Sequence, residues 1–108
     1  PTANFDLFIE AVNYARENNI PIKAGNVLSS DEFYGDNPDE YKLWAQYGIL
    51  CVEMETAGLY TIAAKYDVRA LTVLTISDSL VTGDHLSSTE RETSFKDMVE
   101  IALAAAMA

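Results

Sequence analysis

The stretch that decides the fold is Val52-Glu53-Met54-Glu55-Thr56-Ala57-Gly58-Leu59-Tyr60, in which a short apolar strand ends in two acids and continues into a helix. The run 49–52 is apolar throughout, as in a buried parallel strand, and Gly48 separates it from the preceding residues. Glu53 and Glu55 therefore stand at the carboxyl end of a strand, the edge at which open α/β sheets bind ligands. Because they are two residues apart, an extended chain points both to one face.

A purely structural explanation of these two acids stays open. Negative charge in the first turn of a helix is stabilised by the helix dipole in any protein. Glu55 also begins a helical pattern of apolar residues that continues to about Tyr66. The residues alone thus support two interpretations, a ligand contact or a favourable helix start.

Length and charge limit the function classes. The 108 residues suit one domain over 1–108. With 17 acidic and 7 basic residues the formal net charge is −10, which opposes binding to nucleic acid or to an anionic membrane. No apolar run has membrane-spanning length and no signal-like segment opens the chain, so we expect a cytoplasmic protein. Cys51 lies in the apolar run, where we expect a buried small hydrophobe, with a reactive thiol as the alternative.

Two elements precede the deciding stretch at the beginning of the chain. Apolar residues at helical spacing predict a helix from Phe5 that ends at 18–19. Residues 22–29 have strand character, with Gly25 marking a bulge or a close approach of two backbones.

A polar loop and a short helix connect these elements to the deciding stretch. The loop over 30–36 contains Phe33 and Tyr34, which either cover a corner of the core or form a flat wall for a ring-shaped ligand. Asn37-Pro38-Asp39-Glu40 predicts a helix start, and Gly48 suits the left-handed position after the end of that helix.

A second apolar strand is predicted at 70–76. Strand, helix and strand in this order imply a right-handed parallel crossover, which places Ile76 beside Val52. Asp78 then lies at the same edge as the two glutamates, although an aspartate at such a place is more often a turn residue that bonds its own backbone. Three acids without a histidine or cysteine suit only a hard cation, and we assign no metal.

The last helix begins at Ser87-Ser88-Thr89-Glu90, which has the pattern of a capping box. Arg91 follows in the first turn, where the helix dipole disfavours a cation, and this unfavourable position suggests a task for it. His85 is a single loop histidine, more typical of a solvated residue than of a catalytic one.

Together these stretches resemble one family, the bacterial hexameric (high-molecular-mass) purine nucleoside phosphorylases, in their carboxyl-terminal part. Val-Glu-Met-Glu alone recurs across a wider superfamily, but four motifs in order over nearly all 108 residues are specific. The motifs are Gly25–Asp31 with Phe33-Tyr34, Val52–Tyr60, Ser77-Asp78, and Ser88–Phe95 with Arg91. The resemblance implies an α/β chain that is part of a three-layer α/β/α fold with a mixed central sheet, in a homohexamer. The amino-terminal, phosphate-binding portion of the family has no counterpart in these residues.

The resemblance also implies an activity: phosphorolysis of a purine (deoxy)nucleoside to free purine and a pentose 1-phosphate. Inorganic phosphate is then a co-substrate and no cofactor is needed. By matching position, Phe33 would pack on the purine and ribose, and Val52 and Met54 would line the pocket. Glu53 and Glu55 would contact the ribose. Ser77 and Asp78 would face the base, and Arg91 would assist Asp78.

Within this family Asp78 corresponds to the general acid at the purine N7. Protonation there neutralises the purine anion as the glycosidic bond breaks, and general acid catalysis typically contributes about 10²–10⁴-fold. An aspartate needs a buried site to hold a proton for this purpose, because burial raises its pKa. Ser79 stands where family members often carry histidine, so the preference between 6-oxo and 6-amino purines stays open.

Two alternative functions stay open for this sequence. A methylthioadenosine or adenosylhomocysteine nucleosidase, a hydrolase, shares the Val-Glu-Met-Glu and Ser-Asp elements, although 88–95 with Arg91 favours the phosphorylase. A non-catalytic assembly subdomain would bury the strand edges of this short chain against a partner, such as a companion chain.

Overall fold

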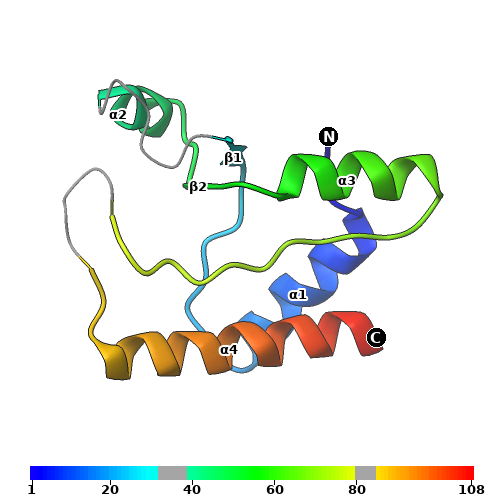
Figure 1. The fold of residues 1–108 in the computed structure, drawn as a ribbon. Coiled ribbons are helices and arrows are strands. Elements are labelled where there is room, and N and C mark those ends of the chain that lie inside the picture. Colours follow the sequence, from blue (N-terminus) through cyan, green and yellow to red (C-terminus); the bar gives the residue numbers. More distant parts are fainter. Residues whose placement is uncertain (32–38, 80–84) are drawn as a thin grey trace.

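The computed structural model describes residues 1–31, 39–79 and 85–108, and these form an α/β structure of four helices and two strands (Figure 1). In chain order the elements are α1 (Phe5–Glu17), β1 (Val27–Ser29), α2 (Asp39–Gln46), β2 (Cys51–Glu53), α3 (Thr56–Lys65) and α4 (Ser88–Met107). The principal extents of the molecule are 40 × 36 × 22 Å.

The helices begin and end close to the predicted residues. The side chain of Asn4 caps α1 by accepting a hydrogen bond of 2.9 Å from the backbone N–H of Leu7. Asn18 ends this helix and Asn19 has a positive φ of 55°, which confirms the predicted end at 18–19. Gly48 follows α2 with a φ of 79°, the left-handed conformation expected there. Of the predicted start of α2, Asn37 and Pro38 lie outside the described residues.

The sheet consists of β1 and β2, which run parallel. Their register is Val27↔Cys51, Leu28↔Val52 and Ser29↔Glu53. The strand predicted over 22–29 is shorter than expected and is confined to β1. A Cβ at Gly25 would lie 3.1 Å from Cδ1 of Leu50, so the close neighbour of this glycine is a side chain and not the second backbone that was predicted.

The prediction of a strand over 70–76, with Ile76 beside Val52, is wrong. Figure 1 shows this segment as an extended trace after α3, and among the described residues it pairs with no strand. A β-branched sequence favours an extended backbone, but a strand also needs a neighbour to complete its hydrogen bonds. Here the carbonyl of Ala70 accepts from the N–H of Asn4 at 2.8 Å, and the N–H of Thr72 donates to the Tyr60 hydroxyl at 2.9 Å.

The buried core lies between α1 and α4. Its members are Ala11 and Ala15 of α1 with Ile101 and Ala105 of α4, and the partly buried Tyr14, Ile20, Leu71 and Val73 pack against them. Alanines on both helices allow the two backbones to approach closely. In Figure 1 the two strands and α2 lie on the opposite side of the molecule from α4, so the sheet is separate from this core.

Much apolar surface stays uncovered. The accessible surface is 8079 Å², against roughly 6,000 Å² for a folded monomer of this mass. On α3 the exposed fraction is 60% for Ile62 and 47% for Leu59, and on α4 it is 57% for Phe95. A helix with apolar residues on several faces is normally buried on those faces, so the described elements lack covering partners.

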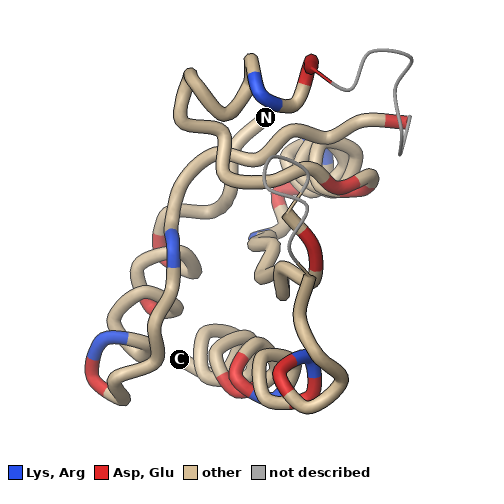
Figure 2. Tube along the Cα trace, turned by 90° about the vertical axis from the view of Figure 1, so that its left-hand side faces the viewer, with Lys and Arg blue, Asp and Glu red and all other residues tan. Residues whose placement is uncertain are grey.

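The charged residues are distributed unevenly along the described chain. Figure 2 shows acidic residues on several elements and the basic residues as short isolated stretches of the trace. None of the helices within 1–31, 39–79 and 85–108 has both the length and the apolar character needed to cross a bilayer.

Candidate active site

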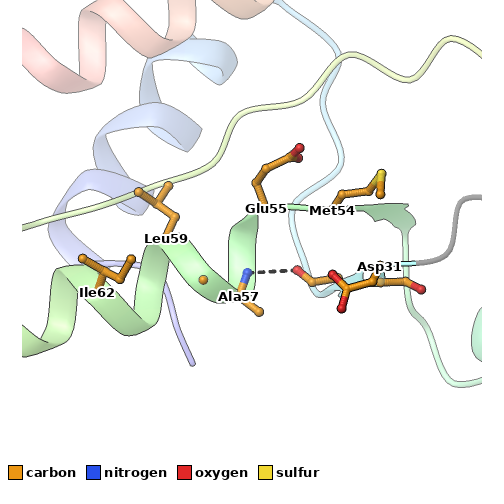
Figure 3. A pocket seen from close by; sticks show the side chains of 9 residues that line it. Asp31, Met54, Glu55, Ala57, Leu59 and Ile62 are labelled. Atoms are coloured by element: carbon orange, nitrogen blue, oxygen red, sulfur yellow. Dashed lines mark hydrogen bonds between the residues drawn. The ribbon is translucent and has the colours of Figure 1, made fainter.

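A pocket of about 610 Å³ lies where β1 and β2 end and α3 begins (Figure 3). Its lining comes from the end of β1, the end of β2 and the first turns of α3: Ser29, Ser30, Asp31, Met54, Glu55, Ala57, Gly58, Leu59 and Ile62. The pocket therefore lies at the carboxyl edge of the parallel strands, where open α/β sheets bind ligands. Polar groups of the strand ends meet apolar side chains of α3 there, a combination that suits a ligand with a polar and an apolar part.

The carboxylate of Glu53 is occupied by hydrogen bonds from its own chain. Ser29 donates its hydroxyl to Oε1. Oε2 accepts from the backbone N–H groups of Glu55 and Thr56, both at 2.7 Å. Partial desolvation raises the pKa of Glu53, but these hydrogen bonds outweigh it and hold the pKa below its ordinary value. Glu53 therefore acts as an anionic cap on the first turn of α3.

Ser29 completes this cap. Its hydroxyl oxygen accepts a hydrogen bond of 2.9 Å from the N–H of Ala57, drawn as a dashed line in Figure 3. The N–H groups of three consecutive residues, 55–57, are thus bonded by two side chains from the two strands. Helix N-termini with unpaired N–H groups often bind phosphate, but these three groups already have partners.

Glu53 and Glu55 do not share the same surroundings. Glu55 lines the pocket and makes no capping hydrogen bond, whereas Glu53 is not among the lining residues. The expectation that both point to one face assumed an extended chain, but the chain bends at 54–55 on its way into α3.

A hydroxyl pair with one buried member joins α3 to the segment that follows it. Thr56 is only 4% exposed and donates its hydroxyl to the hydroxyl of Thr72 at 3.0 Å. Neither this pair nor the role of Ser29 was predicted from the sequence. The register that places Ser29 opposite Glu53 is a long-range pairing, and no local signal in the sequence indicates it.

Ser77, Asp78 and Arg91 form a second group. Nη2 of Arg91 lies 3.6 Å from Oδ1 of Asp78, and the Ser77 hydroxyl donates to Oδ2 at 3.3 Å. The structure thus brings these three predicted residues together, although none of them lines the pocket. The side chains of Asp78 and Arg91 are 54% and 51% exposed, so the described chain does not supply the burial expected for Asp78.

The beginning of α4 positions Arg91. The Ser87 hydroxyl accepts from the N–H of Glu90 and the Glu90 carboxylate accepts from the N–H of Ser87, both at 3.1 Å, which confirms the predicted capping box. These hydrogen bonds hold the pKa of Glu90 below its ordinary value. On the other side of the loop, Asp78 forms an antiparallel bridge with His85.

The remaining predicted residues have separate places. Val52 lies in β2 opposite Leu28 and does not line the pocket, whereas Met54 lines it and is 43% exposed. Phe33 lies outside the described residues. Burial raises the pKa of the Cys51 thiol, and the charge of Glu53 raises it further, so the thiol form is favoured. Within the described ranges, no group of three or more His, Cys, Asp and Glu side chains lies close enough to hold a metal ion.

Comparisons with known proteins show to which family the chain belongs. The family model of the phosphorylase superfamily matches residues 1–108. The chain is 58% identical over 103 residues to the DeoD-type purine nucleoside phosphorylase of Thermoanaerobacter sp. (strain X514), covering 95% of this chain and 44% of that protein. It is 53% identical over 107 residues to the protein of the same name from Clostridium perfringens (strain SM101 / Type A), covering 99% of this chain and 46% of that protein.

The chain thus spans less than half the length of the curated relatives it matches. The family match extends over every residue, including both strand ends and the helix starts that build the pocket and the Asp78–Arg91 pair. The chain therefore belongs to the phosphorylase superfamily.

Proposed function

We propose that this chain supplies the base-binding and ribose-binding part of a purine nucleoside phosphorylase. The observation that carries the proposal is the 58% identity over 103 residues to a protein of that name. Its reaction converts a purine (deoxy)nucleoside and inorganic phosphate to free purine and (deoxy)ribose 1-phosphate.

In this proposal the pocket at the beginning of α3 receives the ribose. Glu55 lines that pocket with no capping hydrogen bond of its own, so its carboxylate is available to ribose hydroxyls. A carboxylate there positions the sugar and stabilises the positive charge that develops as the glycosidic bond breaks. Met54, which lines the pocket, and Phe33 would contribute apolar contacts.

Asp78 is the proposed general acid at the purine N7, with Arg91 beside it and Ser77 facing the base. The ion pair at 3.6 Å supports this assignment, because a neighbouring guanidinium stabilises the carboxylate left after proton donation. A proton donor of this kind also needs exclusion of water, and Asp78 is 54% exposed. The proposal therefore includes a cover over Asp78 from outside the described residues.

In this proposal the residues that cover Asp78 belong to a larger assembly. We propose that residues 1–108 are the carboxyl-terminal portion of one domain with a three-layer α/β/α fold and a mixed central sheet, in a cytoplasmic homohexamer. The apolar surface on α3 and α4 and the unpaired extended segment 70–76 support this, since both need neighbours. The phosphate site also belongs to the rest of the assembly, because Glu53 and Ser29 already occupy the N-terminal N–H groups of α3.

The direct test uses the assembled enzyme with inosine and phosphate. Asp78→Asn removes the proton donor and should lower kcat by about 10²–10⁴-fold, with a much smaller change in KM. Steady-state kinetics with quantification of the released base measure both constants.

Two outcomes contradict the proposal. An unchanged kcat in Asp78→Asn would remove Asp78 from the chemistry. Product formation without phosphate would identify the protein as a nucleosidase, because hydrolysis needs only water. Native mass spectrometry of the purified assembly shows which companion chains accompany the 11.9 kDa chain.

A further inference from the structure

We infer that Ser29 and Glu53 are positioning residues, which together set the place of the pocket wall formed by Met54 and Glu55. The inference rests on the proposed function for its kinetic consequence, but its geometry stands on hydrogen bonds within the chain. It gives Glu53 a different role from a direct ribose contact, and it adds Ser29 as a residue on which substrate binding depends.

The two oxygens of the Glu53 carboxylate have separate partners. Oε1 accepts from the Ser29 hydroxyl at the end of β1, while Oε2 accepts from the N–H groups of Glu55 and Thr56. A carboxylate used in this way has little remaining capacity for a ribose hydroxyl. The lowered pKa of Glu53 agrees with this, because each of these donors stabilises the charged form.

The Ser29 hydroxyl connects the strands to the helix. It donates to Glu53 and at the same time accepts from the N–H of Ala57 at 2.9 Å. In addition, the N–H of Ser30 donates to the carbonyl of Glu53 at 2.9 Å, which continues the pairing of β1 and β2 by one residue. The end of β1, the end of β2 and the first turn of α3 are therefore joined at one point.

Met54 and Glu55 lie between these joined groups. Both residues line the pocket, and Figure 3 shows both side chains projecting from the chain just before α3. Their backbone runs from Glu53 to Thr56, and the Glu53 carboxylate bonds the N–H groups of Glu55 and Thr56. Loss of either Ser29 or Glu53 frees this bend, and a displaced Glu55 would hold the ribose less well.

A carboxyl titration followed by NMR tests the geometry without reference to activity. Ser29→Ala should raise the pKa of Glu53 toward its ordinary value and speed amide hydrogen exchange at Ala57 by about tenfold, since one hydrogen bond is lost from each. Ser29→Thr keeps a hydroxyl and should restore both values. Thr61→Ala is the matched control, because its hydroxyl bonds the Ala57 carbonyl on the exposed side of α3 and should leave the pKa of Glu53 unchanged.

Kinetics of the assembled enzyme test the positioning role. Ser29→Ala and Glu53→Gln should each raise KM for inosine about tenfold, with a smaller change in kcat, and the double variant should resemble either single variant. Ser29→Thr should return KM to the wild-type value.

Three results would each overturn part of the inference about Ser29 and Glu53. An unchanged pKa of Glu53 in Ser29→Ala overturns the hydrogen-bonded arrangement itself. Altered pKa and exchange with an unchanged KM overturn the positioning role. A raised KM in Glu53→Gln alone, with wild-type kinetics in Ser29→Ala, would instead make Glu53 a direct ribose contact. A wild-type enzyme that lacks phosphorolysis would contradict the proposed function, while the NMR result would stand by itself.

Discussion

Glu53 and Asp78 are both acids at the end of an extended segment, and the structure treats them differently. Glu53 ends β2 and accepts hydrogen bonds from Ser29 and from two N–H groups of the chain. Asp78 follows the segment 70–76 and has an ion pair with Arg91 at 3.6 Å and a hydrogen bond of 3.3 Å from Ser77, with 54% of its side chain exposed. Glu53 accepts three hydrogen bonds from its own chain, whereas Asp78 accepts one from Ser77 and pairs with a guanidinium that is 51% exposed.

The difference originates in the strands that lead to them. β2 has β1 as a parallel neighbour, and the pairing places Ser29 beside Glu53. The segment 70–76 has no strand neighbour within the described residues, so no second strand end stands beside Asp78. Acids in similar sequence positions thus take different roles because only one has a paired strand beside it. The contrast should be visible in the stabilities of variants at the two acids.

The largest effect on stability is expected for Glu53→Ala. The substitution leaves the N–H groups of Glu55 and Thr56 and the Ser29 hydroxyl without their acceptor, so the free energy of unfolding should fall by about 2 kcal/mol. Urea unfolding of the chain measures the change. Glu55→Ala is the control, since Glu55 makes no capping hydrogen bond and its removal should change the free energy of unfolding by less than about 0.5 kcal/mol.

The stabilising contribution of the Glu53 carboxylate should depend on pH. Because the pKa of Glu53 is lowered on folding, its contribution is complete above the unfolded-state pKa of about 4.3 and is lost as the pH falls through the lower folded pKa. Stability of the wild type should therefore fall more steeply in this acid range than stability of Glu53→Ala. Parallel pH profiles for the two proteins would contradict the anionic cap.

An intermediate effect is expected for Thr56→Val. Val has nearly the shape of Thr but cannot donate to the Thr72 hydroxyl, so this pair should lose about 1 kcal/mol of unfolding free energy. The measurement is again urea unfolding, with Thr61→Val on the exposed face of α3 as control. A Thr56→Val protein as stable as the wild type would show that the hydroxyl pair does not hold 70–76 against α3.

The smallest effect is expected at the exposed pair. Asp78→Ala and Arg91→Ala should each change the free energy of unfolding by less than about 0.5 kcal/mol, because exposed ion pairs contribute little. Raising the salt concentration should remove even that difference. A loss of 2 kcal/mol or more in either variant would mean that Asp78 is held as firmly as Glu53, and the contrast between the two acids would fail.

The local features of the fold were predictable. The helix that ends at 18–19, the left-handed Gly48 and the capping box of Ser87 and Glu90 depend on neighbours within a few residues, and each prediction is confirmed. At Gly25 a bulge or a close approach of two backbones was predicted, but the neighbour found there is the Leu50 side chain.

The candidate site was predictable only in part. The residues at the two segment ends were identified by type, and family resemblance assigned roles to them. The strand at 70–76 was not confirmed, because an apolar β-branched run determines an extended backbone without providing a partner. The separation of Glu53 from Glu55 was missed for a similar reason, since the bend at 54–55 depends on hydrogen bonds to the Glu53 carboxylate and to Ser29.

The sequence by itself determined membership of the phosphorylase superfamily, the helix ends and the place of the acids at the ends of extended segments. Each of these depends on residue types at short spacing, which local backbone preferences and caps decide. Only the tertiary structure decided that Glu53 caps α3 through Ser29 while Asp78 stays half exposed beside Arg91. Those outcomes depend on which distant segments pair, and the pairing of β1 with β2 joins residues 24 positions apart.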